Sequence, residues 1–193
     1  NQYQEIARLA KLSLSALEAE VFGLIRSSLK GEKESLVLLD IGAQTTTINV
    51  VSGGVLRSSR SIDIGGGSLS SRIAESLSIA SHQAEQEKVT KGITSKQMLD
   101  VLSPLLDVII TDIQRATSEF SEKERKEIQK IVLGGGSALL PGLKEYMAEA
   151  LSKKAEIIDP FSNIFYPPIL EGTMKKAGPA FAVAVGMALR GLA

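Results

Sequence analysis

Residues 36–52, LVLLDIGAQTTTINVVS, constrain the fold of this chain more than any other stretch. Two apolar, β-branched segments are joined by a short turn that contains Gly42, which predicts a β-hairpin. Asp40 adds a carboxylate where the first strand ends, and Thr45 and Thr46 add hydroxyls. Backbone amides beside a glycine, hydroxyls, and a carboxylate that holds the waters of a cation are the parts of a phosphate–Mg²⁺ site. A tight turn with a solvated aspartate accounts for these residues equally well.

Composition excludes several classes of protein. The chain has 193 residues with 44% hydrophobic and 23% charged, which is typical of a soluble α/β domain. The 22 basic residues balance 22 acidic ones without a Lys/Arg run, which argues against nucleic-acid binding. With no Cys and only His82, thiolate sites, disulfides and His clusters are excluded. No apolar run approaches the roughly 20 residues of a membrane span and no signal pattern is present, so we expect a cytoplasmic protein without direct membrane insertion.

The remaining hydrophobic patterns predict a three-stranded meander followed by strands that alternate with helices. This order predicts an α/β fold with a mixed five-stranded sheet covered by helices. The predicted strands are 36–40, 45–51, 55–64, 130–133 and 155–159, with a further short strand possible at 12–20. The predicted helices are 1–12, 21–31, 65–81, 81–92, 95–119, 141–151 and 177–192.

Two glycine runs follow predicted strands, Gly65-Gly66-Gly67 and Gly134-Gly135-Gly136. A glycine run at a strand-to-helix junction brings amides against a phosphate at the positive end of the helix, although a tight connection explains the first run equally well. Glu85 and Lys88 lie three residues apart on a predicted helix and therefore share one face. Taken alone, that pair favours a surface ion pair worth tenths of a kcal/mol.

Three segments in a fixed order, DIGAQTT at 40–46, QAEQEK at 83–88 and LGGGSALLPGL at 133–143, resemble the nucleotide-binding half of the actin-like ATPase superfamily. That superfamily includes actin, heat-shock ATPase chaperones, sugar kinases and FtsA. The likeness is strongest to PilM-like proteins of type IV pilus assembly, and it includes Asp159-Pro160-Phe161 and the ending AVGMALRGL. The resemblance implies a ribonuclease H-like, actin-like ATPase lobe.

The resemblance also implies a site for ATP and Mg²⁺. Amides from Gly42 onward would hold the β- and γ-phosphates, and Asp40 would bind Mg²⁺ through water. Glu85 and Lys88 would flank the ribose and base, and the second glycine run would leave room for the purine and α-phosphate. No catalytic base is identified. The expected nucleotide-binding residues are Asp40, Gly42, Gln44, Thr45, Thr46, Gly66, Gly67, Glu85, Lys88, Gly134, Gly135, Gly136 and Ser137.

Actin-like proteins have two comparable lobes, each with its own phosphate hairpin, whereas this chain has one such hairpin. We therefore expect residues 1–31 to be the remnant of a preceding lobe with a connecting helix, and residues 32–193 to form the C-terminal nucleotide-binding lobe of a longer protein. The expected lobe would carry at most a slow ATPase in that longer protein.

The implied function is a nucleotide-dependent scaffold of type IV pilus or related secretion assembly. It would be held at the inner membrane by the inner-membrane pilus assembly proteins of the alignment complex, and a homo-oligomer is possible. Alternatives are a division scaffold that resembles FtsA, a small-molecule kinase of the same superfamily, and an interaction lobe that binds no nucleotide.

Overall fold

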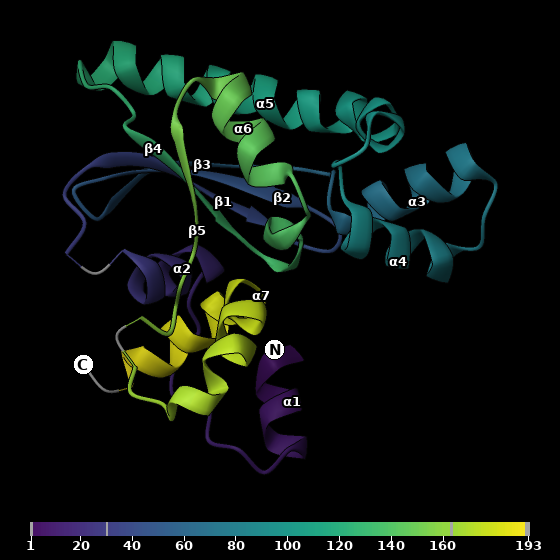
Figure 1. Ribbon diagram of the computed structural model, residues 1–193. Coiled ribbons are helices and arrows are strands. Elements are labelled where there is room, and N and C mark those ends of the chain that lie inside the picture. Colours follow the sequence, from purple (N-terminus) through teal and green to yellow (C-terminus); the bar gives the residue numbers. More distant parts are fainter. Residues whose placement is uncertain (1, 30, 163, 192–193) are drawn as a thin grey trace.

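The computed structural model describes residues 2–29, 31–162 and 164–191. Its centre is a sheet in the order β3-β2-β1-β4-β5 with helices on both faces (Figure 1). The meander β1–β2–β3 is antiparallel, and β4 and β5 run parallel to β1. The predicted mixed five-stranded sheet is therefore confirmed. The strands are β1 (Ser35–Ile41), β2 (Thr46–Ser52), β3 (Val55–Ile62), β4 (Lys130–Gly134) and β5 (Lys154–Ile157).

Helices α5 and α6 cover one face of the sheet, α2 and α7 cover the other, and α3 and α4 lie at one end (Figure 1). The α-helices are α1 (Gln2–Leu9), α2 (Glu20–Ser28), α3 (Gly66–Leu77), α4 (Ser81–Lys91), α5 (Lys96–Glu124), α6 (Leu143–Leu151) and α7 (Glu171–Arg190). Two short 3₁₀ helices are η1 (Gly136–Leu139) and η2 (Pro168–Leu170). The possible strand at 12–20 does not form: residues 12–19 have no regular structure, and Glu20 begins α2.

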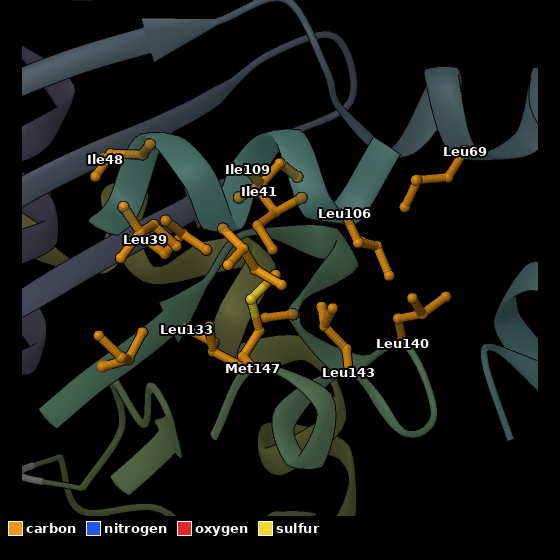
Figure 2. Close-up of a cluster of buried hydrophobic side chains, with 14 of the residues drawn as sticks. Leu39, Ile41, Ile48, Leu69, Leu106, Ile109, Leu133, Leu140, Leu143 and Met147 are labelled. Atoms are coloured by element: carbon orange, nitrogen blue, oxygen red, sulfur yellow. The ribbon is translucent and has the colours of Figure 1, made fainter. Parts of the chain in front are cut away.

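Strand β1 is buried on both faces and divides the interior into two cores. Leu39 and Ile41 join the larger core with α3, α5 and α6 (Figure 2). Leu36 and Leu38 face the smaller core with α2 and α7. A near-continuous apolar run is what a strand covered on both sides requires, which explains LVLL before Asp40.

The register of the sheet places two loops at one edge. Asp40 is opposite Gly134 in the parallel β1–β4 pair and opposite Thr47 in the antiparallel β1–β2 pair. Strands β1 and β4 therefore finish together, and the hairpin turn after Ile41 emerges beside the glycine run after Leu133. This edge positions the candidate site.

Helices α2 and α7 cross in direct backbone contact. A Cβ added to Gly186 would lie 1.8 Å from the carbonyl oxygen of Gly23, so α7 cannot carry a larger residue there and the two helices cannot move closer. Arg26 donates to the Gly186 carbonyl at 2.9 Å and to both carboxylate oxygens of Glu18, at 2.7 and 3.1 Å. The crossing is thus fixed by close backbone packing and by the part-buried hydrogen bonds of Arg26.

Candidate nucleotide site

A cavity of about 890 Å³ lies where three turns meet at the carboxyl edge of β1 and β4. Its volume is within the range of small-molecule sites. The hairpin turn, the start of α3, helix α4, the η1 turn and helix α7 all contribute. The lining residues are Gly42, Ala43, Gly66, Gly67, Glu85, Lys88, Val89, Gly136, Ser137, Leu139, Leu140 and Lys176.

The first glycine run is a tight connection. The amide of Gly66 donates to the Gly42 carbonyl at 2.8 Å, and that of Gly67 donates to the Ala43 carbonyl at 2.7 Å. A Cβ on Gly65 would lie 2.6 Å from the carbonyl carbon of Gln44, so only glycine permits this stacking. Both amides at the start of α3 are engaged, and they are not available to a phosphate.

The hairpin turn keeps other amides available. The amide of Gly42 itself donates to the Thr45 carbonyl at 2.9 Å, which closes the turn. Within the described ranges, the amides of Ala43 and Gln44 donate no hydrogen bond. Two consecutive free amides next to a cavity form a concave donor pair suited to an anion. The free amides of this turn therefore begin one residue after Gly42.

Lys88 is buried and joins two helices. Its side chain is 9% exposed, and its ammonium donates to the Gly66 carbonyl at 3.0 Å while pairing with Glu85 at 2.8 Å. Ser70 also donates to the Glu85 carboxylate, at 2.5 Å. Burial acts to raise the pKa of Glu85, but the hydrogen bonds from Lys88 and Ser70 outweigh it and lower the pKa. The pair is more than a solvated surface contact, because Lys88 fixes α4 against the first turn of α3.

The second glycine run packs against the end of β1. Gly135 has a φ of +84°, and a Cβ there would lie 2.4 Å from the Ile41 carbonyl oxygen and 2.5 Å from an Asp40 carboxylate oxygen. Its amide donates to the Pro179 carbonyl of α7 at 3.0 Å. Residue 135 must therefore be glycine for both conformational and steric reasons.

Three predicted residues from different elements converge on the cavity wall. A Cβ added to Gly66 would lie 2.5 Å from the Ser137 hydroxyl and 3.2 Å from the Lys88 ammonium. The bare backbone of Gly66 therefore lets the Ser137 hydroxyl and the Lys88 ammonium approach it closely, and all three line the cavity. A hydroxyl, an ammonium and bare backbone on one cavity wall suit a sugar or a phosphate.

Other predicted residues do not line the cavity. Thr46 is fully buried and its hydroxyl donates to the Ile64 carbonyl at 2.6 Å, so it holds the connection to α3. Gln44 is exposed, Thr45 is half-buried, and Gly134 is buried in the sheet beside Leu39. Gly135 acts as a spacer behind the wall. The assignment of these residues to nucleotide binding remains a prediction.

Asp40 also lies outside the cavity lining, because the alternation along β1 turns it toward α2 and α7. Burial, and then the negative charge of Glu20, raise the pKa of its carboxyl. Among the described residues, this carboxyl makes no ion pair or hydrogen bond. The described residues also contain no group of three or more acidic or histidine side chains that could hold a metal. A single free carboxylate fits Mg²⁺, which keeps several waters and takes its other ligands from phosphates.

Sequence reasoning missed five of the lining residues. Ala43 and Val89 adjoin predicted residues, so proximity in sequence could have found them. The 39% exposed Leu139 and buried Leu140 follow the glycine run within the segment 133–143, so proximity in sequence could have found them too. Lys176 has no local signal, because it reaches the cavity only through the packing of α7 against η1.

A sequence model of the family described as type IV pilus assembly protein PilM matches residues 13–192. The chain belongs to the PilM family. The chain of a solved PilM-PilN type IV pilus biogenesis complex superimposes with a TM-score of 0.84 and 25% identity, covering 99% of this chain and 57% of that one. The prediction of a PilM-like lobe with an actin-like ATPase fold is confirmed.

Two further proteins are similar to this chain. The cell division protein FtsA of Agrobacterium fabrum strain C58 is 28% identical across 92% of this chain and 45% of its own length. MreB5 of Spiroplasma citri, solved bound to ADP, has a TM-score of 0.68 at 17% identity, over 97% of this chain and 63% of that one. The chain thus spans about half the length of the curated relatives it matches. Within the described ranges, no helix combines the length and apolarity needed to cross a bilayer.

Proposed function

We propose that this PilM-family lobe binds ATP with Mg²⁺ and acts as a nucleotide-dependent scaffold in type IV pilus assembly. The observation that carries this proposal is the cavity in which Gly66, Lys88 and Ser137 converge from three elements. The ADP complex of MreB5, which has the same fold, supports a nucleotide as the ligand.

In this proposal the two ends of the ATP meet different groups. The free amides of Ala43 and Gln44 hold the terminal phosphates, and Lys88 and Ser137 bind the ribose or α-phosphate. The divalent ion neutralises phosphate charge when bound, and Asp40 holds its waters. Glu85, fixed by Lys88 and Ser70, is oriented toward the ribose hydroxyls.

The scaffold role follows from the position of α7. Pro179 of α7 accepts a hydrogen bond from the Gly135 amide, and seven residues further along Gly186 abuts Gly23 of α2. A ligand with different affinities for two α7 positions would shift the population between them and change the surface offered to partners. The PilM-PilN complex of the similar structure supports inner-membrane pilus assembly proteins as those partners. This role needs no rapid hydrolysis.

The experiment is a calorimetric titration of MgATP into the natural full-length protein and two variants. Asp40→Ala removes the proposed holder of the metal waters and should weaken MgATP binding tenfold or more. Asp63→Ala removes an exposed carboxylate in the loop before α3 and should leave the affinity unchanged. Equal affinities for Asp40→Ala and the unmodified protein would remove Asp40 from the site, and an absence of any ATP binding would refute the proposed function.

The 28% identity to FtsA favours one alternative, a division scaffold with the same nucleotide site. A pull-down of the natural full-length protein with inner-membrane pilus components or with division proteins distinguishes the two. Selective recovery of division proteins would favour the FtsA-like function.

A further inference from the structure

The charged side chains that line the described cavity are not balanced. Glu85 and Lys88 neutralise each other at 2.8 Å. Lys176 also lines the cavity, and its ammonium makes no ion pair or hydrogen bond with the described residues. Its neighbour Lys175 differs on both counts, because it pairs with Glu171 at 2.7 Å and lines a separate cavity of about 290 Å³. Among the described residues that line the cavity, Lys176 is therefore the one cation without an ionic partner.

The packing of α7 places Lys176 on the η1 side of the cavity. The hydrogen bond from Gly135 to Pro179 fixes α7 against the glycine turn about one helical turn beyond Lys176. Leu139 of η1 lines both this cavity and the one beside Lys175, so it lies next to this part of α7. Lys176 is thus on the opposite side from α3 and α4.

The same side of the cavity offers an apolar surface, made by Leu139 and Leu140. Val89 adds a further aliphatic side chain from α4, across the cavity, and both Val89 and Leu139 are exposed. The glycine turns and free amides at the other side suit phosphates, so a base would lie against the aliphatic residues. A lysine can extend its methylenes along such a surface and present its ammonium at the edge of a base.

We propose that Lys176 reads the base and that the site accepts ATP and GTP alike. An ammonium donates hydrogen bonds and accepts none. Both purines present N7 as an acceptor; guanine adds the acceptor O6, where adenine has an amino donor. Selecting adenine requires an acceptor at that amino group. Among the described lining side chains, the aliphatic ones supply none. The two that can accept, the Ser137 hydroxyl and the Glu85 carboxylate, whose Oε2 takes Lys88 and Ser70, serve the ribose and α-phosphate in the proposed function. This inference rests on the proposed nucleotide site.

The test titrates MgATP, MgGTP and MgCTP separately into the natural full-length protein. The dissociation constants for ATP and GTP should agree within about tenfold, whereas CTP, which lacks N7, should bind about tenfold more weakly or worse. An ATP preference over GTP greater than tenfold overturns the inference while leaving the proposed function intact. Failure of every nucleotide to bind overturns both.

The variants test the residue itself. Lys176→Ala should weaken GTP about tenfold and ATP less, because guanine loses two acceptor contacts and adenine one, and CTP binding should stay unchanged. Lys175→Ala, the adjacent lysine outside the cavity, should leave all three affinities unchanged. The assignment of Lys176 is overturned if Lys176→Ala has the same affinities as the unmodified protein. It is also overturned if the affinities for all three nucleotides fall by the same factor. Circular dichroism confirms that both variants are folded.

Discussion

At the scale of single residues, the candidate site depends on backbone groups whose use only the fold reveals. The sequence predicted Gly66 and Gly67 as nucleotide-binding residues, and both do line the cavity. It could not predict that their amides would be taken by the carbonyls of Gly42 and Ala43. Spacing identifies where glycines recur, but the partner of each amide depends on which turn packs beside it. Lys176 was missed for the same reason, since its neighbours lie far away in sequence.

Gly135→Ala tests the close packing behind the site. The added Cβ would meet the Ile41 carbonyl at 2.4 Å in a backbone conformation that side chains rarely adopt. Strain and overpacking together should lower the free energy of unfolding by about 3 kcal/mol. Urea denaturation measures this loss. Gly31→Ala serves as the control, because it shares a positive φ of +80° but meets nothing within 4 Å, and it should lose about 1 kcal/mol. Equal losses would mean that contact with β1 is unimportant.

At the scale of elements, segments with a strong hydrophobic periodicity were predicted correctly, whereas the partial alternation at 12–20 was misleading. The meander and the helices with long apolar stripes are confirmed, with boundaries that differ by a few residues. The possible strand at 12–20 is wrong because partial alternation cannot form a strand without a neighbouring edge to accept its hydrogen bonds. Helix α5 continues through charged residues to Glu124. It ends there, since Arg125 adopts a left-handed φ of +55°.

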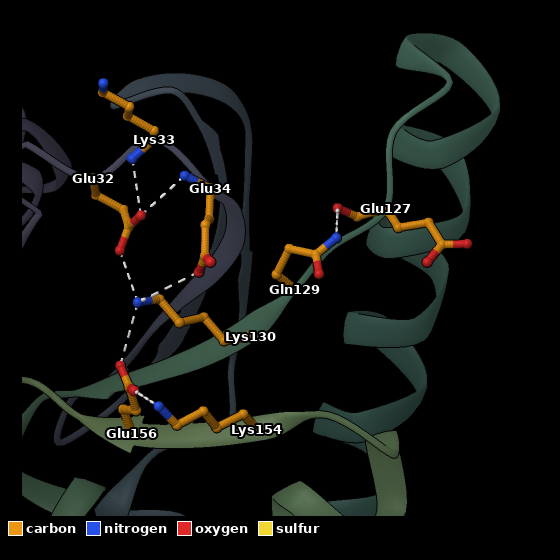
Figure 3. Close-up of polar contacts among 8 residues, drawn as sticks. All are labelled: Glu32, Lys33, Glu34, Glu127, Gln129, Lys130, Lys154 and Glu156. Atoms are coloured by element: carbon orange, nitrogen blue, oxygen red, sulfur yellow. Dashed lines mark hydrogen bonds and ion pairs between the residues drawn. The ribbon is translucent and has the colours of Figure 1, made fainter.

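Charged residues join the connection after α2 to the sheet (Figure 3). The Lys130 ammonium, on a side chain 17% exposed, lies 2.7 Å from Glu32 and 3.4 Å from Glu156. The hydrogen bond from Lys130 lowers the pKa of Glu32, and that from Lys154, aided by Lys130, lowers the pKa of Glu156. Carboxyls with a lowered pKa in the folded state stabilise it above their unfolded pKa, and that stability is lost as the pH falls through the folded pKa.

We therefore expect the unfolding free energy to fall as the pH drops below about 5, since an unfolded glutamate titrates near pH 4.3. Lys130→Met should be less stable than the unmodified chain at pH 7, and the difference should narrow toward pH 3. Urea denaturation between pH 3 and pH 7 measures both. Lys154→Met, at an exposed position, should have a smaller effect at pH 7. A difference that is constant across this pH range would contradict the assignment.

At the scale of the whole molecule, two cores around one sheet hold together the described residues from Glu20 onward, whereas α1 contributes no buried residue. Its apolar side chains Tyr3, Ile6 and Leu9 are all more than half exposed. We expect a chain beginning at residue 13 to keep the melting temperature of the full 193 residues within about 2 °C, because a helix that buries nothing adds little stability. Differential scanning calorimetry measures the difference. A larger drop would show that α1 supports the fold.

The contact between Gly23 and Gly186 has a mechanical consequence. Side chains between two helices form a soft layer that can absorb a small displacement by changing rotamers. Here carbonyl and Cα atoms touch directly, so a tilt imposed at one end of α7 cannot be damped at the crossing. The crossing therefore acts as a rigid pivot, and a small displacement of the cavity end of α7 would be passed on to the start of α2.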